Sequence, residues 1–271
     1  MEFAAASDWL ARRASLTLIP DGPTLADRWP RLSTGGAPDW IILLSGHPGE
    51  WGSAAVLRVR ARFPLARVIH LLGSWQEGER RSGRPLAGTW PVLWHRWLPF
   101  FDREWRALEA GQPGQLAAPV TVGMAELVEV EGRWQMPGRR RRVQVRAAAA
   151  VAAQGLVEAC RELGHEVVEQ QPEVVLGDES GWSREGLLLG NLAGEAGSER
   201  FLGRALGRRR LVISAGVRWQ EVRQWLDDGV GGVIAKPFLL GDLAWWIDYL
   251  ASVAGGEEQF VPLVGTDLCP V

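Results

Sequence analysis

Three residues whose types suit chemistry follow predicted β-strands in the second half of the chain. Asp178 ends the run PEVVLGD, Ser214 lies in the run RRLVISAG, and Lys236 ends GGVIAK. In an open parallel sheet, ligands and chemistry belong at the carboxyl ends of the strands. A carboxylate, a hydroxyl and an ammonium group are therefore expected together, where they suit an ion pair or a site for a charged ligand.

Lys236 is the single lysine among thirty basic residues, the others being arginines. A compact ammonium group and a planar guanidinium group are not interchangeable beside a carboxylate. The presence of a single lysine is also compatible with chance. Its predicted position at a strand end offers a chemical reason why lysine, and not arginine, stands there.

The second half alternates strand and helix patterns, which predicts a parallel sheet covered on both faces. Five strands and about four helices are expected. The strands are predicted at 142–147, 165–170, 172–178, 209–216 and 231–237, and the helices at 148–163, 198–207, 219–229 and 241–255. Too few residues separate the second and third strands for a helix, so this crossover is expected to be shortened to a loop.

Over residues 140–254 the chain resembles the receiver domain of bacterial response regulators. The matching stretches are ELGHEVVE, PEVVLGD, LVISAG and DDGVGGVIAKPF. The resemblance implies a flavodoxin-like, doubly wound fold in which Asp178 accepts a phosphoryl group, Ser214 supplies a hydroxyl and Lys236 contacts the acceptor. It also implies a cis peptide bond before Pro237.

The acidic pair that holds Mg²⁺ in that family is missing. Its positions fall on Ala147 and Ala148, and the aromatic residue often found three positions before the lysine is Val233. Phosphoryl transfer depends on Mg²⁺ to neutralise charge. No metal site and no cofactor are therefore expected, although weak Mg²⁺ binding by one aspartate is compatible with the sequence.

Simpler roles stand beside each of these functional ones. Asp178 is also compatible with a role in capping a turn. Lys236 is compatible with an internal ion pair with Asp178 that remains from the family's site. The RRRR run at 139–142 is interpreted as a solvated strand entry in preference to a nucleic-acid patch.

The first half repeats the same outline faintly, which indicates a tandem architecture. PDWIILLSG parallels PEVVLGDES, ARVIHLLGS parallels RRLVISAGV, and WLPFFDREW parallels AKPFLLGDL; the polar site residues are replaced by Leu44, Leu72 and Leu98. We expect two receiver-like domains with central five-stranded parallel sheets. The expected division is a degenerate domain over 1–110, a linker over 111–138, the receiver-like domain over 139–254 and a tail over 255–271.

Composition excludes several other classes of protein. The net charge of −2 lends no support to nucleic-acid binding, and Cys160 and Cys269 suggest neither a disulfide framework nor a metal cage. His47, His70 and His95 lack the spacing of metal ligands. No run has the length of a membrane span or the order of a signal peptide, so a cytoplasmic location is expected.

These patterns favour a non-enzymatic, degenerate receiver protein in signal transduction, without an output domain, that acts by contact with a partner protein or as a homodimer. Its candidate partner surface comprises Trp225, Trp245 and Tyr249 on the last two helices, because aromatic residues often anchor interfaces. The alternative is a working phosphorelay receiver with Asp178 as the phosphorylated residue. A nucleotide-binding cleft and a hydrolase have less support, since neither a phosphate-cradling motif nor a nucleophile elbow was recognised.

Overall fold

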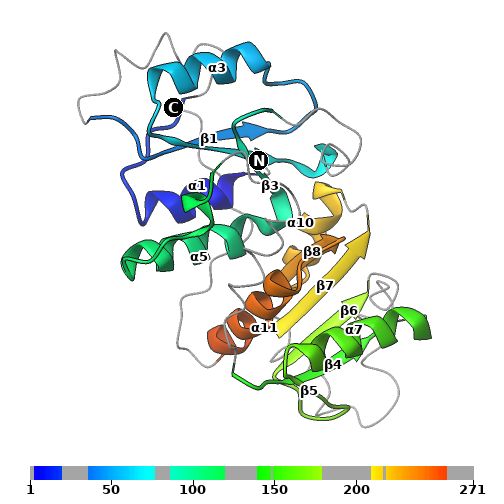
Figure 1. Ribbon diagram of the computed structural model, residues 1–271. Helices are drawn as coiled ribbons and strands as arrows, with labels where there is room; N and C mark the ends of the chain where they lie inside the picture. Colours follow the sequence, from blue (N-terminus) through cyan, green and yellow to red (C-terminus); the bar gives the residue numbers. More distant parts are fainter. Residues whose placement is uncertain are drawn as a thin grey trace. The chain divides into compact units, whose positions relative to one another are not determined.

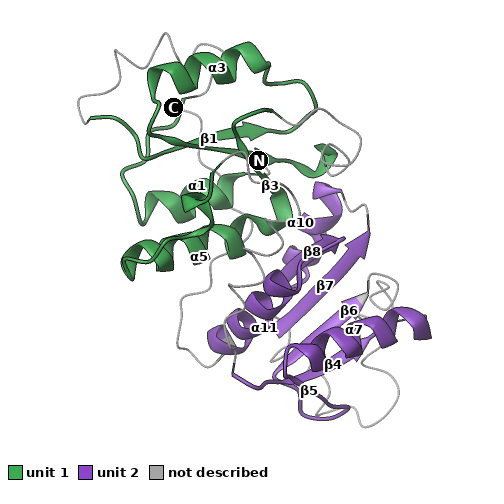
Figure 2. Cartoon of the chain, viewed as in Figure 1, with its two compact units in different colours: residues 1–130, 265–271 green, residues 131–264 purple. Residues whose placement is uncertain are grey.

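The chain folds into two compact units in a computed structural model (Figure 2). One unit comprises residues 1–130 with 265–271, and the other residues 131–264. The structure describes residues 3–19, 36–76, 86–119, 139–147, 149–178, 209–215 and 218–254.

The second unit contains a five-stranded sheet in which every neighbouring pair is parallel (Figure 1). Its strands are β4 (Arg142–Arg146), β5 (Glu166–Val167), β6 (Val174–Asp178), β7 (Arg210–Ala215) and β8 (Gly232–Lys236). The spatial order is β5-β4-β6-β7-β8. An order of 2-1-3-4-5 is compatible with a flavodoxin-like kind of fold, so the α/β class and the five parallel strands are confirmed for this half.

Three helices of this unit lie in the described residues: α7 (Ala150–Glu162), α10 (Trp219–Asp227) and α11 (Leu240–Ala254). Each turns an apolar stripe inward, as the 3.6-residue period predicts; Leu156, Val222 and Leu243 are buried members of these stripes. Residues 168–173 connect β5 to β6 without a helix, which confirms the shortened crossover. The helix expected at 198–207 lies outside the described residues.

Helix α11 packs closely on the sheet at Gly232. A Cβ atom at this position would lie 2.6 Å from the ring of Trp246, which is 1% exposed. The missing side chain on β8 therefore makes room for the indole.

The first unit contains a three-stranded parallel sheet in the order β1-β2-β3. Its elements are β1 (Trp40–Ser45), β2 (Arg67–Leu72), β3 (Trp90–Leu93), α1 (Ala4–Ala11), α3 (Ser53–Arg62), α5 (Trp97–Glu109) and the 3₁₀ turns η2 (Ser74–Gln76), η3 (Trp94–Arg96) and η4 (Gln115–Ala117). The expected sheet of five strands differs from the three that the described residues form. The apolar run at residues 15–19 lies outside this sheet.

The parallel drawn between WLPFF and AKPFL is wrong. Leu98 and Pro99 lie in the first turn of α5, whereas Lys236 ends β8 and Pro237 follows it. Proline is tolerated in a first helical turn because the N–H groups there lack intrahelical partners anyway. The same dipeptide pattern thus serves two different backbone conformations.

Aromatic side chains form much of the first unit's core. Trp9 stacks on Phe101 with ring centroids 6.3 Å apart, and Trp97 meets Trp9 edge-on at 6.5 Å. Phe101 also stacks on Trp40 at 6.0 Å. The tryptophans therefore serve mainly as core fillers that tie α1 and α5 to β1.

The start of the expected linker is packed against α5. The carboxylate of Glu104 accepts hydrogen bonds from the backbone N–H groups of Gln115 (2.6 Å) and Leu116 (3.1 Å) at the start of η4. Burial raises the pKa of Glu104, and the two backbone hydrogen bonds oppose this shift. A Cβ atom on Gly114 would lie 2.3 Å from the same carboxylate, so a side chain at this position would force the carboxylate of Glu104 to move.

Candidate functional site

The backbone register brings the predicted site residues to one edge of the five-stranded sheet. Asp178 is the last residue of β6 and pairs with Ile213 of β7; the next residue of β7 is Ser214, which pairs with Ala235. Lys236 follows Ala235 and ends β8. Three residues distant in sequence thus occupy neighbouring positions at the carboxyl ends of adjacent strands, as the sequence predicts.

Ser214 and Lys236 differ in their exposure to solvent. Ser214 is fully buried at 0% exposure, whereas Lys236 is half-buried at the end of its strand. The peptide bond between Lys236 and Pro237 is cis, as the resemblance implies. The ammonium group therefore belongs to the last residue of β8.

The end of β4 supplies an arginine and an alanine. Arg146 of β4 pairs with Gly177 of β6. The next residues along these two neighbouring strands are Ala147 and Asp178. The other expected substitution, Ala148, lies outside the described residues. Arg146 donates from Nε to Gln144 Oε1 at 3.2 Å. This strand end thus offers a guanidinium group, with a methyl group next to it.

A second arginine, Arg210, begins β7, which β6 separates from β4. Burial lowers the pKa of Arg210, and the nearby charge of Arg146 lowers it further. The two guanidinium groups are therefore close enough to influence each other, but Arg210 lies at the opposite end of β7 from Ser214.

Metal ligands do not gather anywhere in the residues that the structure describes: no three His, Cys, Asp or Glu side chains are close enough together to hold an ion. Chemically, the edge offers an aspartate position, a buried hydroxyl and a half-buried ammonium group. Such a set suits an ion pair or the binding of an anion, and Lys236 and Asp178 are its charged members.

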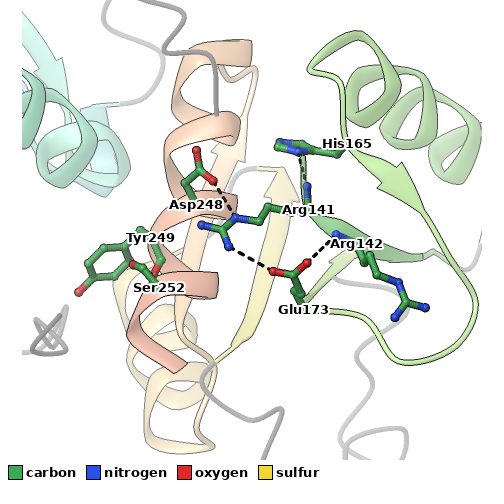
Figure 3. Close-up of polar contacts among 7 residues, drawn as sticks. All are labelled: Arg141, Arg142, His165, Glu173, Asp248, Tyr249 and Ser252. Atoms are coloured by element: carbon green, nitrogen blue, oxygen red, sulfur yellow. Dashed lines mark hydrogen bonds and ion pairs between the residues drawn. The ribbon is translucent and has the colours of Figure 1, made fainter. Parts of the chain in front are cut away.

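The residues expected to form a partner surface lie on α10 and α11. Trp225 and Trp245 are half-buried and Tyr249 is 7% exposed. Trp245 and Tyr249 stack, with ring centroids 4.7 Å apart and an interplanar angle of 14°. In Figure 3, Tyr249 points away from Arg141. The two rings therefore form one stacked aromatic pair on α11.

A polar network at the opposite end of the sheet was missed by the sequence analysis (Figure 3). Arg141 Nε lies 3.0 Å from Asp248 Oδ1 of α11, and Arg141 Nη1 lies 3.2 Å from Glu173 Oε2, just before β6. Glu173 Oε1 also accepts from the backbone N–H of Arg142 at 3.2 Å. The expectation of a solvated strand entry is therefore wrong for Arg141, whose side chain is only 16% exposed. Sequence spacing held no signal for it, because Arg141 and Asp248 are 107 residues apart.

His165 borders this network. Its Nδ1 accepts from the backbone N–H of Arg141 at 3.4 Å, and among the described residues its buried Nε2 has no hydrogen-bond partner. Burial lowers the pKa of His165; Asp248 and Glu173 act to raise it and Arg141 to lower it. The folded chain therefore disfavours protonation of the ring.

Cys160 shows no sign of reactivity. It is fully buried in α7, and burial raises the pKa of its thiol to about 12. A thiol that stays protonated at neutral pH is a poor nucleophile. Cys269 lies outside the described residues.

Comparison with protein-family models and with curated proteins finds no match to the chain. None of the helices in the described ranges combines the length and apolar character needed to cross a bilayer.

Proposed function

We propose that residues 139–254 form a degenerate receiver module that acts through protein contacts and does not depend on Mg²⁺-dependent phosphorylation. It has no catalytic residues in this proposal, and the partner is a protein of a signalling system or a second copy of the chain. The observation that carries the proposal is the carboxyl edge of the sheet, where Asp178, Ser214 and Lys236 adjoin Ala147 in place of a metal-binding carboxylate.

The charge around the edge supports the loss of phosphorylation. A receiver needs Mg²⁺ to neutralise the incoming phosphoryl group, and carboxylate oxygens are the usual ligands of that ion. At the end of β4 stand the guanidinium group of Arg146 and the methyl group of Ala147. A site with this charge is expected to bind Mg²⁺ weakly.

In this proposal Lys236 keeps a structural role. The ammonium group at the end of β8 neutralises the carboxylate of Asp178, which retains the geometry of the site without its reaction. A double-mutant cycle with Asp178→Asn and Lys236→Met measures their coupling. The ion-pair role requires a favourable coupling energy of about 0.5–3 kcal/mol, and strictly additive effects would exclude it.

Incubation with acetyl phosphate and Mg²⁺, followed by intact-mass measurement, tests the absence of phosphorylation. No phosphate adduct is expected on the full chain. The alternative function, a phosphorelay receiver with Asp178 as acceptor, is favoured by the strand-end position of that residue. It predicts an adduct that is absent from Asp178→Asn.

Contact through α10 and α11 is tested separately. We expect the tagged chain to recover a reproducible partner from its native lysate, and Trp225→Ala and Trp245→Ala to reduce that recovery, because half-buried aromatic residues commonly anchor interfaces. Trp75→Ala, on an exposed residue of the first unit, is the control. Recovery that is equal for all four proteins would contradict this role for the two tryptophans.

A further inference from the structure

Helix α3 of the first unit presents an exposed stripe that is both apolar and basic. Val56 and Val59 turn inward at 1% exposure, which leaves the opposite side of the helix in solvent. That side carries Leu57 (64% exposed) and, just after the helix, Leu65 (93%). Arg58, Ala61 and Arg62 lie between them and are exposed.

No acidic residue balances these arginines within α3. The helix reads SAAVLRVRAR, so its charges are all positive and lie in its second half, at Arg58, Arg60 and Arg62. Two large exposed leucines beside two arginines form a surface that suits an apolar strip flanked by carboxylates.

Helix α7 of the second unit presents a stripe of that kind. Val151 is 83% exposed, and Gly155, Glu158 and Glu162 follow it on the exposed side, while Leu156 and Cys160 face inward. Gln154 Nε2 donates to Glu158 Oε1 at 3.0 Å, which holds this carboxylate at the helix surface.

Gly155 gives an independent reason to expect a close neighbour. Glycine destabilises the interior of a helix relative to alanine. A Cβ atom placed on Gly155 meets nothing within 4 Å among the described residues, so packing against these residues does not explain the glycine. A flat spot in the middle of an exposed helix suits the close approach of a second helix.

We propose that the chain associates with copies of itself through α3 of one copy and α7 of another. Aligned in parallel, the two stripes set Leu57 against Val151, Ala61 against Gly155 and Arg62 beside Glu158. The exposure of Leu57 (64%) and Val151 (83%) shows that neither side chain is covered by the described residues of its own unit.

The expected contact is weak and depends on concentration. One helix pair buries less surface than a stable dimer interface normally requires. Because the two surfaces differ, the contact is heterologous, and a dimer retains one unused stripe of each kind, α7 on one copy and α3 on the other. Association is expected to grow beyond the dimer with concentration and to weaken in salt, since exposed charges are screened.

Sedimentation velocity of the full chain over a range of concentrations tests the proposal. Arg58→Glu/Arg62→Glu should weaken self-association about tenfold or more, because like charges then face each other. Combining it with Glu158→Arg/Glu162→Arg should restore association. Arg12→Glu/Arg139→Glu changes the net charge equally on other exposed residues and should leave association unchanged.

Gly155→Gln distinguishes an effect on self-association from an effect on the stability of the fold. The variant should raise the melting temperature by removing a helix glycine, and should also weaken self-association by filling the flat spot. A chain that remains monomeric up to its solubility limit would overturn the proposal, as would charge-swapped variants that fail to recover. These substitutions leave Asp178 and the α10 and α11 aromatic residues intact, so failure here is distinguishable from failure of the proposed receiver role.

Discussion

Gly232 shows how a single missing side chain positions a helix. Gly232→Ala should lower the free energy of unfolding by about 1–3 kcal/mol, since overpacking forces backbone or ring shifts. The new Cβ atom would lie 2.6 Å from the Trp246 ring. Urea unfolding of both proteins measures the difference.

Gly155→Ala is the matched control for this substitution. Its new methyl group meets open space, so we expect a gain of about 0.5–1 kcal/mol from the removal of a helix glycine. Equal effects of the two alanines would show that the contact with Trp246 is unimportant.

Several residue positions were predictable from the sequence because strand ends and helix stripes are local patterns. Asp178, Ser214 and Lys236 were assigned to strand ends from short apolar runs, and the register places them at one edge. Leu98 was misplaced because a Pro-Phe step specifies neither a helix start nor a strand end by itself. The contacts of Arg141 were not predictable, since its partners belong to segments brought together only by the fold.

At the scale of elements, Arg141 joins α11 to the entries of β4 and β6. Arg141→Ala should cost about 1–3 kcal/mol of unfolding free energy, because Asp248 and Glu173 lose a charged hydrogen-bond donor. Both ion pairs involve a side chain that is only 16% exposed. Chemical denaturation provides the measurement.

The adjacent Arg140 is a natural control. Its contact with Glu166 spans 3.6 Å, with side chains 74% and 48% exposed. Exposed pairs contribute little, so Arg140→Ala should change stability by roughly 0.5 kcal/mol or less. Comparable losses from the two alanines would refute a special role for Arg141.

His165 makes the same junction sensitive to acid. Its pKa is lower in the folded chain than in the unfolded chain, so below the unfolded value of 6.5 the unfolded state binds more protons. Stability should therefore fall as the pH drops from neutral through 6.5 towards the folded pKa. Protonation of His165 at Nδ1 would also break its hydrogen bond with Arg141, because the backbone N–H of Arg141 would then face a second N–H donor.

Melting temperatures of wild type and His165→Gln across this pH window measure the effect. The glutamine cannot titrate, so its curve should be flatter on the acid side. Parallel curves for the two proteins would assign the acid sensitivity to other groups.

Across the whole molecule, the two sheets share a pattern but differ in extent. In the first unit, β1, β2 and β3 lie in chain order, as do β6, β7 and β8 in the second. The sequence similarity between the halves consists of short apolar runs. Buried strands need such runs in any sheet, whichever strands lie next to them. The number of strands was not predictable from those runs, because a β-rich segment joins a sheet only where the fold offers it an edge.

Mg²⁺ provides a test on the full chain. A ligand that binds the folded state raises the melting temperature. MgCl₂ should leave the melting temperature of the wild type at the value found in KCl of equal ionic strength. Ala147→Asp/Ala148→Asp should gain an Mg²⁺-dependent rise by supplying the missing carboxylates. A rise in the wild type that Asp178→Asn abolishes would contradict the degenerate site.

The single lysine also allows the carboxyl edge of the second unit's sheet to be labelled selectively. Apart from the α-amino group of the chain, Lys236 carries the one primary amine among its 271 residues. An amine-reactive reagent can therefore place a label at the end of β8 without any cysteine engineering. The rate of that labelling, followed residue-specifically by mass spectrometry, would report directly when a ligand or a protein covers this edge.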